Sequence, residues 1–437
     1  MKLAGYHFAV IAHYDAYLHN AGAFAQAVCD AGGTVDFLTL SSRGMEVSGA
    51  QLSSVCRYWP ALQRLKPARI GIEALRDPSL LALYSGLFFG AGGEELLVGF
   101  RNLREGFASL GSRRPVVVTG FPGIVDAGRT AGMLFRCPSD IVLLPASAQL
   151  RVYRLEMSLL GKRTGNGLLY GMPSLPPPAP ISASLSPIRR ILFIDQSVIP
   201  DTPDDRRALV VELARLLDNL PNAEIWIRER VREGETSIHE LGSAVKLSKL
   251  VAELKQRLPA LARVKMKHEP LTSLFGQVDA AISISSTGLL EAFAAGLPIA
   301  SLERFSRVPK FGNGFFRTSG IQVDVEELSD DRWPAPNEKW VQKNILSPTQ
   351  ISNLDQLTGQ QRLVQKLAAI VSSPRRNLPN PVEHGPVSRQ IARWRPHVLV
   401  QRAFGLFSWP RRDSPFSFAL RKNNRYHAAR GPEGETE

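Results

Sequence analysis

The sequence predicts an α/β protein built from two doubly wound, Rossmann-like domains, followed by an irregular basic C-terminal tail. Three observations support this fold class. Short apolar runs of strand length alternate with helical segments along most of the chain. A proline-rich stretch interrupts this alternation near the middle of the 437 residues, a length that exceeds one ordinary core. Arginines interspersed with aromatic residues replace the alternation after about residue 373.

The proline-rich stretch sets the domain organisation. Its prolines can neither continue a helix nor join a central strand, so we interpret it as a semi-rigid linker. The expected parts are an N-terminal domain over 1–172, a linker over 173–187, a C-terminal domain over 188–373 and a tail over 374–437.

The bulk composition indicates a soluble globular protein, with 44% hydrophobic and 21% charged residues. No apolar run is long enough to span a bilayer, and the N-terminus is too polar for a signal peptide. Three widely spaced cysteines suit a reducing compartment, so we expect a cytoplasmic location. The net charge of +13 favours anionic partners, although no nucleic-acid-binding motif accompanies it.

The first strand is expected over 7–12, and a loop over 13–20 should lead to a helix over 21–31. Ligands of doubly wound sheets bind at the carboxyl ends of strands, which makes this loop a candidate site. His13, Asp15 and His19 can all move protons, and we prefer Asp15 as the base that deprotonates an acceptor hydroxyl. The structural alternative is that His19 only caps the helix.

The rest of the first half continues the alternation. A second strand is expected over 34–40, and helices and loops over 48–107. The glycines of 90–93 do not match a dinucleotide-binding spacing and no clean strand precedes them, so we assign them no function. A strand over 115–120 ends in Thr119 and Gly120, which could line a cleft or simply belong to a tight turn. A strand over 139–146 and a helix over 147–161 complete the domain.

The second half restarts with a strand over 189–196 and a helix that opens at Thr202 or Pro203. A strand over 224–227 delivers Arg228 and Arg230 into a loop, where they suit a diphosphate or form a solvated charge run. A helix over 248–258 and a strand over 264–267 follow. His268 and Glu269 then stand at the entrance of a short helix.

The strongest local signal is a βαβ unit over 279–302. A buried strand over 280–284 leads into the hydroxyl-rich turn 285–288, a helix opening at Thr287 or Gly288, and a strand over 298–302. Free N–H groups and the positive end of the helix dipole favour a phosphate at this turn. Glu291, one turn later, could reach a sugar hydroxyl, or could complete an ordinary capping box.

Together, the proline-rich linker and the residues Ser285-Ser286-Thr287-Gly288-Leu289-Leu290-Glu291-Ala292, followed by Ala295-Gly296-Leu297-Pro298, resemble a glycosyltransferase of the GT-B fold. The likeness is greatest to bacterial capsule and polysialic-acid-type transferases, and to an uncharacterised group of glycosyltransferases with a similar Asp-x-Tyr-Leu loop. It covers about 188–305, and the N-terminal half matches in outline. The glutamate signature also occurs in sugar-nucleotide epimerases of this fold.

This resemblance implies two domains facing a cleft, with a nucleotide-sugar as substrate and no cofactor. The hydroxyl-rich turn would bind the donor phosphate, and Asp15 would be the base for direct displacement at the anomeric carbon. No Asp-x-Asp motif stands at a strand end, so we expect no metal. The predicted residues are Asp15, His13 and His19 for catalysis, Ser285, Ser286, Thr287, Gly288, Glu291, His268, Glu269, Arg228 and Arg230 for the donor, and Thr119 and Gly120 for the cleft.

We therefore expect a transferase that moves a sugar to a glycan or lipid-linked acceptor in surface polysaccharide synthesis. One alternative is a sugar-nucleotide epimerase or hydrolase of the same fold. Another is a non-catalytic module of this fold that docks on the inner face of a membrane through its basic aromatic tail. That tail could equally wrap back over the domains.

Overall fold

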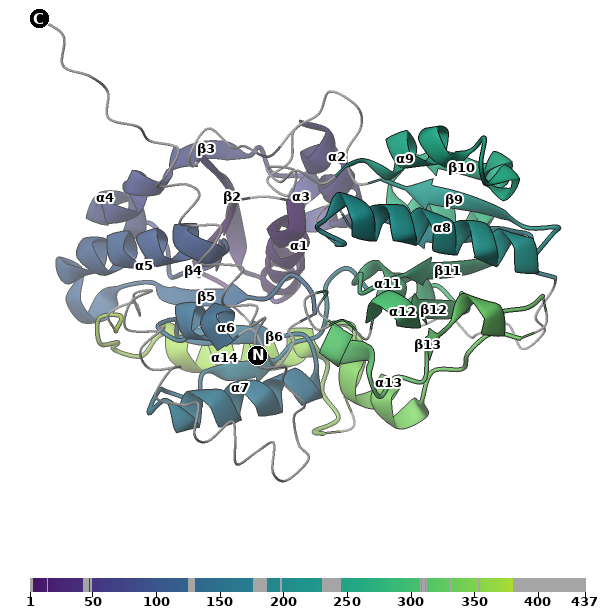
Figure 1. The fold of residues 1–437 in the computed structure, drawn as a ribbon. Helices are drawn as coiled ribbons and strands as arrows, with labels where there is room; N and C mark the ends of the chain where they lie inside the picture. Colours follow the sequence, from purple (N-terminus) through teal and green to yellow (C-terminus); the bar gives the residue numbers. More distant parts are fainter. Residues whose placement is uncertain are drawn as a thin grey trace, which may run out of the picture.

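The computed structural model contains two parallel β-sheets with helices on their faces (Figure 1). It describes residues 3–379, except 14, 42–46, 48, 125–129, 176–186, 197–198, 230–244, 307, 309–310, 312, 331 and 353.

The first sheet has the order β3-β2-β1-β4-β5-β6-β7. Its strands are β1 (His7–Ala12), β2 (Thr34–Ser41), β3 (Ala68–Gly71), β4 (Gly86–Gly90), β5 (Val116–Gly120), β6 (Ile141–Leu144) and β7 (Gly167–Leu169). Its helices are α1 (Asp15–Asp30), α2 (Gly49–Tyr58), α3 (Pro60–Gln63), α4 (Pro78–Leu81), α5 (Gly93–Ala108), α6 (Thr130–Arg136) and α7 (Ser147–Leu159), with 3₁₀ turns at Ile72–Arg76 and Gly111–Arg113.

The second sheet has the order β10-β9-β8-β11-β12-β13. Its strands are β8 (Arg190–Ile194), β9 (Glu224–Arg228), β10 (Val264–Lys267), β11 (Ala280–Ser283), β12 (Ile299–Leu302) and β13 (Gln322–Val323). Its helices are α8 (Pro203–Asn219), α9 (Leu247–Leu254), α10 (Leu271–Leu274), α11 (Gly288–Ala294), α12 (Glu303–Ser306) and α13 (Glu338–Asn344). Among the described residues of this domain, 3₁₀ turns lie at Pro259–Arg263, Phe275–Gln277, Asn313–Phe316 and Val325–Glu327.

Both sheets follow the strand order of a Rossmann-like, doubly wound fold, and their paired strands all run parallel. Helices cover both faces of such sheets, which explains why the strands are continuous apolar runs instead of alternating ones. In β4, β5 and β6, for example, every residue is buried. The predicted fold class is confirmed.

The last described helix, α14 (Gly359–Val371), crosses back to the first sheet. A capping box between Thr358 and Gln361 begins it, and Leu363 and Leu367 are completely buried in the core beside α1 and β1. Figure 1 shows this yellow-green helix beneath the strands of the first sheet. Although α14 lies in the range 188–373 predicted for the C-terminal domain, its apolar side packs on the N-terminal one.

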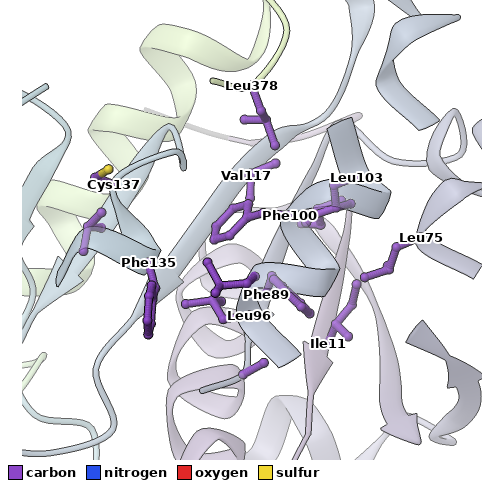
Figure 2. Packing of buried hydrophobic residues seen from close by; sticks show 14 of the residues in the cluster. Ile11, Leu75, Phe89, Leu96, Phe100, Leu103, Val117, Phe135, Cys137 and Leu378 are labelled. Atoms are coloured by element: carbon purple, nitrogen blue, oxygen red, sulfur yellow. The ribbon is translucent and has the colours of Figure 1, made fainter. Parts of the chain in front are cut away.

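The first residues of the predicted tail also pack on the N-terminal sheet. Leu378 is only 2% exposed and joins the cluster that contains Phe100 and Val117 (Figure 2). Arg375 donates from Nε to the carbonyl oxygen of Arg114 at 2.7 Å. Residues 374–379 therefore wrap back over the protein, and the remainder of the predicted tail lies outside the described residues.

Several local predictions were wrong. The expected loop 13–20 is mostly helix, since α1 already begins at Asp15 and neither glycine nor proline opposes helix formation before residue 22. A strand does precede the glycines of 90–93, because the buried β4 ends at Gly90. We did not predict β4 from the sequence because Tyr84, Ser85 and Gly86 interrupt the apolar residues at its start.

Two features of the composition can be compared with the structure. All three cysteines are free thiols, and Cys137 is buried. Among the described residues, no helix has the length and apolarity needed to cross a bilayer.

Candidate functional site

The hydroxyl-rich turn lies at the switch point of the second sheet, between the carboxyl ends of β8 and β11. In doubly wound sheets this reversal of strand order opens a crevice for ligands. Gln196, just after β8, accepts a hydrogen bond through Oε1 from the backbone N–H of Ser285 at 2.9 Å. Ser285 donates from its hydroxyl to the carbonyl oxygen of Phe311 at 2.7 Å. Ser285 is therefore held by the protein and shapes the turn.

The other residues of the turn have different roles. The Ser286 hydroxyl accepts from the backbone N–H of Gly288 at 3.1 Å. Thr287 is the N-cap of α11 but makes no side-chain cap bond, so its hydroxyl is not used by the helix. A Cβ at Gly288 would lie 2.8 Å from Leu271 and 3.1 Å from Ile194, which explains the glycine at this position.

A buried ion pair between Arg206 and Asp195 supports this turn through Gln196. Arg206 is 2% exposed, and its Nη2 lies 3.0 Å from Oδ2 of Asp195. Burial raises the pKa of Asp195, and the adjacent guanidinium opposes that rise. Arg206 also donates from Nη1 to the carbonyl oxygen of Gln196 at 3.3 Å. The pair thus fixes the backbone of the residue whose side chain holds Ser285.

Glu291, one turn into α11, lies where the two domains and the linker meet. Burial raises the pKa of Glu291 to about 7, while the nearby hydroxyl of Ser174 and the positive charge of Arg228 act in the opposite direction. Ser174 belongs to the start of the predicted linker and Arg228 ends β9. Glu291 also contributes, after burial, to the raised pKa of Tyr58 from α2. Its side chain thus interacts beyond its own helix, unlike an ordinary capping-box glutamate.

Arg228 connects Glu291 with the predicted residues at the end of β10. Its Nε donates to the carbonyl oxygen of Glu269 over a long 3.5 Å. Nδ1 of the neighbouring His268 is buried and has no hydrogen-bond partner among the described residues. The strands β9 and β8 separate β10 from β11, a distance of roughly 14 Å at ordinary strand spacing, so Arg228 bridges between them. Arg230 lies outside the described residues.

The first domain touches the turn directly through the loop after β5. A Cβ built on Gly123 would lie only 2.9 Å from Oγ1 of Thr287. Ile124 packs against the apolar cluster of the second domain that contains Leu289 and Leu290. The carboxyl ends of the two sheets therefore face each other, and glycine permits the close approach.

Two predicted cleft residues in β5 have structural contacts. Thr119 is completely buried and donates from Oγ1 to the carbonyl oxygen of Phe89 at 2.9 Å, so its side chain joins neighbouring strands and does not line a cleft. Gly120 is also buried, and a Cβ there would lie 3.0 Å from Nδ2 of Asn20. Its carbonyl oxygen accepts from Nε of Arg136.

The predicted catalytic residues are spread over the start of α1. Asp15 is the first residue of this helix, and its side chain lies outside the described part of the chain. His13 follows β1 and is buried, with its backbone N–H bonded to Gly90. His19 is half-buried, and its Nδ1 accepts from Nε1 of Trp59 at 3.4 Å.

An aromatic pair that the sequence did not single out for function extends from His19 toward Glu291. The ring of Tyr58 packs edge-on against His19 at 5.6 Å and against Trp59 at 5.0 Å. Tyr58 is 39% exposed and interacts electrostatically with Glu291 across the domain boundary. Neither Tyr58 nor Ser174 carries a sequence signal, because only the packing of the domains brings them to this place. Gln196 does follow a predicted strand end.

Three carboxylates at the far edge of the second sheet are close enough to share a cation. The oxygens of Glu303, Asp324 and Glu327 lie within 4.8 Å of one another, and two of the three side chains are exposed. Exposed acidic groups often cluster without a metal, and this group is separate from the turn after β11.

Comparisons with known proteins found one matching family model and several solved structures with a similar fold. A family model described as "Putative glycosyltransferase (DUF6716)" matches residues 8–362. A search of curated proteins found no match.

Similar solved structures have low sequence identity. S. aureus MnaA bound to UDP is 10% identical over 93% of this chain and 99% of that one, with a TM-score of 0.48. Anabaena HepE in complex with UDP-glucose is 11% identical over 84% and 100%, with a TM-score of 0.49. The pneumococcal O-GlcNAc transferase GtfA is 10% identical over 90% and 98%, with a TM-score of 0.41. Similarities at this level do not assign an activity.

Proposed function

The chain belongs to the family described as "Putative glycosyltransferase (DUF6716)", and we propose that it transfers a sugar from a nucleotide-sugar to a glycan or lipid-linked acceptor in surface polysaccharide synthesis. The observation that carries the proposal is the contact between the two sheets' carboxyl ends, where Gly123 of one domain meets Thr287 of the other. A transfer reaction needs two substrates side by side. Two doubly wound sheets whose carboxyl ends face each other can each bind one of them.

The donor would occupy the C-terminal side of this contact. The backbone N–H groups of Ser286 and Thr287 and the hydroxyl of Thr287 can bind phosphate oxygens, and Arg228 adds a positive charge nearby. Glu291 would accept hydrogen bonds from the hydroxyl groups of the sugar or ribose. His268 offers a buried nitrogen without a described partner at the same edge.

The acceptor would occupy the N-terminal side, near the start of α1. In the proposed step the acceptor oxygen bonds to the anomeric carbon while the bond from that carbon to the donor phosphate breaks. Asp15 takes the acceptor's proton, and the nucleotide leaves with the bonding electrons. The positive charges near the turn stabilise the negative charge that develops on the leaving phosphate. We propose no cofactor and no catalytic metal, since the protein supplies these charges itself.

We further propose a cytoplasmic enzyme that works at the inner face of the membrane. Residues 380–437, which carry most arginines of the predicted tail, lie outside the described residues. Their mixture of arginine and aromatic side chains suits an anionic lipid surface.

A thermal-shift screen with UDP, GDP, CMP and their sugars tests the donor site. A ligand that binds the native state raises the melting temperature by mass action. We expect a shift with one nucleotide that is lost in the double variant Ser286→Ala, Thr287→Ala. The matched control Ser158→Ala, Thr318→Ala removes two hydroxyls from exposed positions away from the turn and should keep the shift. No shift with any nucleotide contradicts the proposed donor site.

Product analysis with the selected donor then separates the alternatives. A transferase forms a glycoside when an acceptor is supplied, whereas an epimerase or a hydrolase converts the donor without any acceptor. Asp15→Asn should abolish transfer while the nucleotide-induced thermal shift remains. Retained transfer in Asp15→Asn contradicts the assigned base, and no donor turnover under any condition favours a binding module.

A further inference from the structure

The outer face of helix α7 carries two exposed leucines that contribute little to the protein's core. Leu155 is 48% exposed and Leu159 is 42% exposed. They are four residues apart and so lie on one side of the helix. The opposite side is buried through Leu150, Tyr153 and Met157. Figure 1 shows α7 at the periphery of the first domain.

Positive charges flank these leucines at both ends. Arg151 and Arg154 are exposed on the helix, and Lys162 and Arg163 follow its C-terminus. No ion pair involving these four residues occurs among the described residues. The one acidic residue in 147–165 is Glu156, which is only 7% exposed. We call the set Arg151, Arg154, Leu155, Leu159, Lys162 and Arg163 the α7 outer face.

We propose that the α7 outer face is a docking surface for an anionic phospholipid bilayer. A helix that lies in a membrane interface presents apolar side chains to the acyl boundary and cations to the lipid phosphates, which matches this arrangement. A second copy of the chain would bring like charges together. A nucleic acid would pair with the arginines but would leave the leucines in water. Only the bilayer complements both parts of the face.

The consequence is a defined orientation of the N-terminal domain. Helix α7 begins immediately after β6, whose carboxyl end is adjacent to that of β5 and its loop to Gly123. Docking through α7 therefore keeps the β5–β6 edge of the first sheet close to the lipid surface. The surface is independent of the proposed transfer reaction and of residues 380–437.

Vesicle co-sedimentation of the full-length protein tests this surface, with phosphatidylcholine vesicles that contain or lack phosphatidylglycerol. We expect binding to the mixed vesicles to fall about fivefold for each arginine removed, hence roughly 30-fold for Arg151→Gln, Arg154→Gln. Leu155→Ser, Leu159→Ser should weaken binding by a similar factor, because each half-exposed leucine loses its burial in the interface. The control Leu83→Ser, Leu354→Ser alters leucines that are 64% and 66% exposed elsewhere and should bind as the wild type does.

Each outcome decides the proposal. Because the altered residues are exposed, the variants should keep the melting temperature and the nucleotide-induced shift of the wild type. A lower melting temperature would reveal a folding defect in a variant. Wild-type binding by both α7 variants overturns the proposal and leaves the tail as the membrane contact. Loss in the arginine variant alone also overturns it, since the leucines then do not enter the interface. If Leu155→Ser, Leu159→Ser instead dissociates a dimer in light scattering, the face binds a second copy and the proposal fails.

Discussion

Ionisation of Glu291 should make the protein less stable as the pH rises. Burial raises its pKa from 4.5 to about 7, so the folded state retains a proton that the unfolded state has lost in this interval. At about 1.4 kcal/mol for each pH unit, the free energy of unfolding falls by up to about 3 kcal/mol between pH 4.5 and pH 7. Glu291 keeps some contact with solvent, so we expect about 1–3 kcal/mol.

Glu291→Gln removes this ionisation and preserves the size of the side chain. The variant should match the wild type near pH 5 and exceed its stability at pH 8. For a domain of this size, 1 kcal/mol moves the melting temperature by about 2–4 °C, so the difference of about 1–3 kcal/mol corresponds to roughly 2–12 °C at pH 8. Thermal unfolding of both proteins at pH 5, 6, 7 and 8 measures it. The control Glu73→Gln alters an exposed glutamate and should show no such trend.

The same variant connects stability with the proposed function. A carboxylate that destabilises the fold is expected where a ligand uses it. Glu291→Gln should therefore gain stability at pH 8 and, at the same time, lose part of the thermal shift caused by the selected nucleotide-sugar. A stability difference that is constant from pH 5 to pH 8 would refute the assigned environment of Glu291. If Glu291→Gln shows the same thermal shift with the nucleotide-sugar as the wild type, Glu291 does not contact the donor.

Three further predictions concern the contacts around the site. Gln196→Leu leaves the N–H of Ser285 without its acceptor and should weaken nucleotide binding, measured by calorimetry, about tenfold. An unchanged affinity would mean that the turn keeps its conformation without Gln196. Gly123→Val places a side chain against Oγ1 of Thr287, so turnover and nucleotide affinity should both fall, and unchanged kinetics would show that the two loops need not approach. Leu378→Ala should lower the free energy of unfolding by about 2–4 kcal/mol in denaturant titration, since this side chain is buried in the N-terminal core, and a change below about 0.5 kcal/mol would indicate that residues 374–379 do not pack there.

The predictions that succeeded depend on local pattern. The βαβ unit around 285–288 was located within about a residue of its observed ends, because a buried strand, a hydroxyl-rich turn and a Gly-x-Pro stop are all encoded in adjacent residues. The helix after Thr202 also begins where the cap and Pro203 predict. Local signals of this kind do not require knowledge of the rest of the chain.

The predictions that failed depend on distant packing. Thr119 was expected to line a cleft or to belong to a tight turn, yet its side chain is completely buried and donates to the carbonyl oxygen of Phe89. The loop expected before residue 21 became helix because the residues after Asp15 pack against β1 and β4. Burial against remote elements outweighed the local appearance in both cases.

The sequence by itself therefore determined the fold class and the turn that is the centre of the candidate site, since periodicity and turn chemistry act between neighbouring residues. Only the tertiary structure decided which side chains surround that turn. Tyr58, Ser174 and Arg228 are far apart in the chain and lie near Glu291 because the two sheets place their carboxyl ends against each other. The raised pKa of Glu291 follows from that burial, and no property of a single segment could have predicted it.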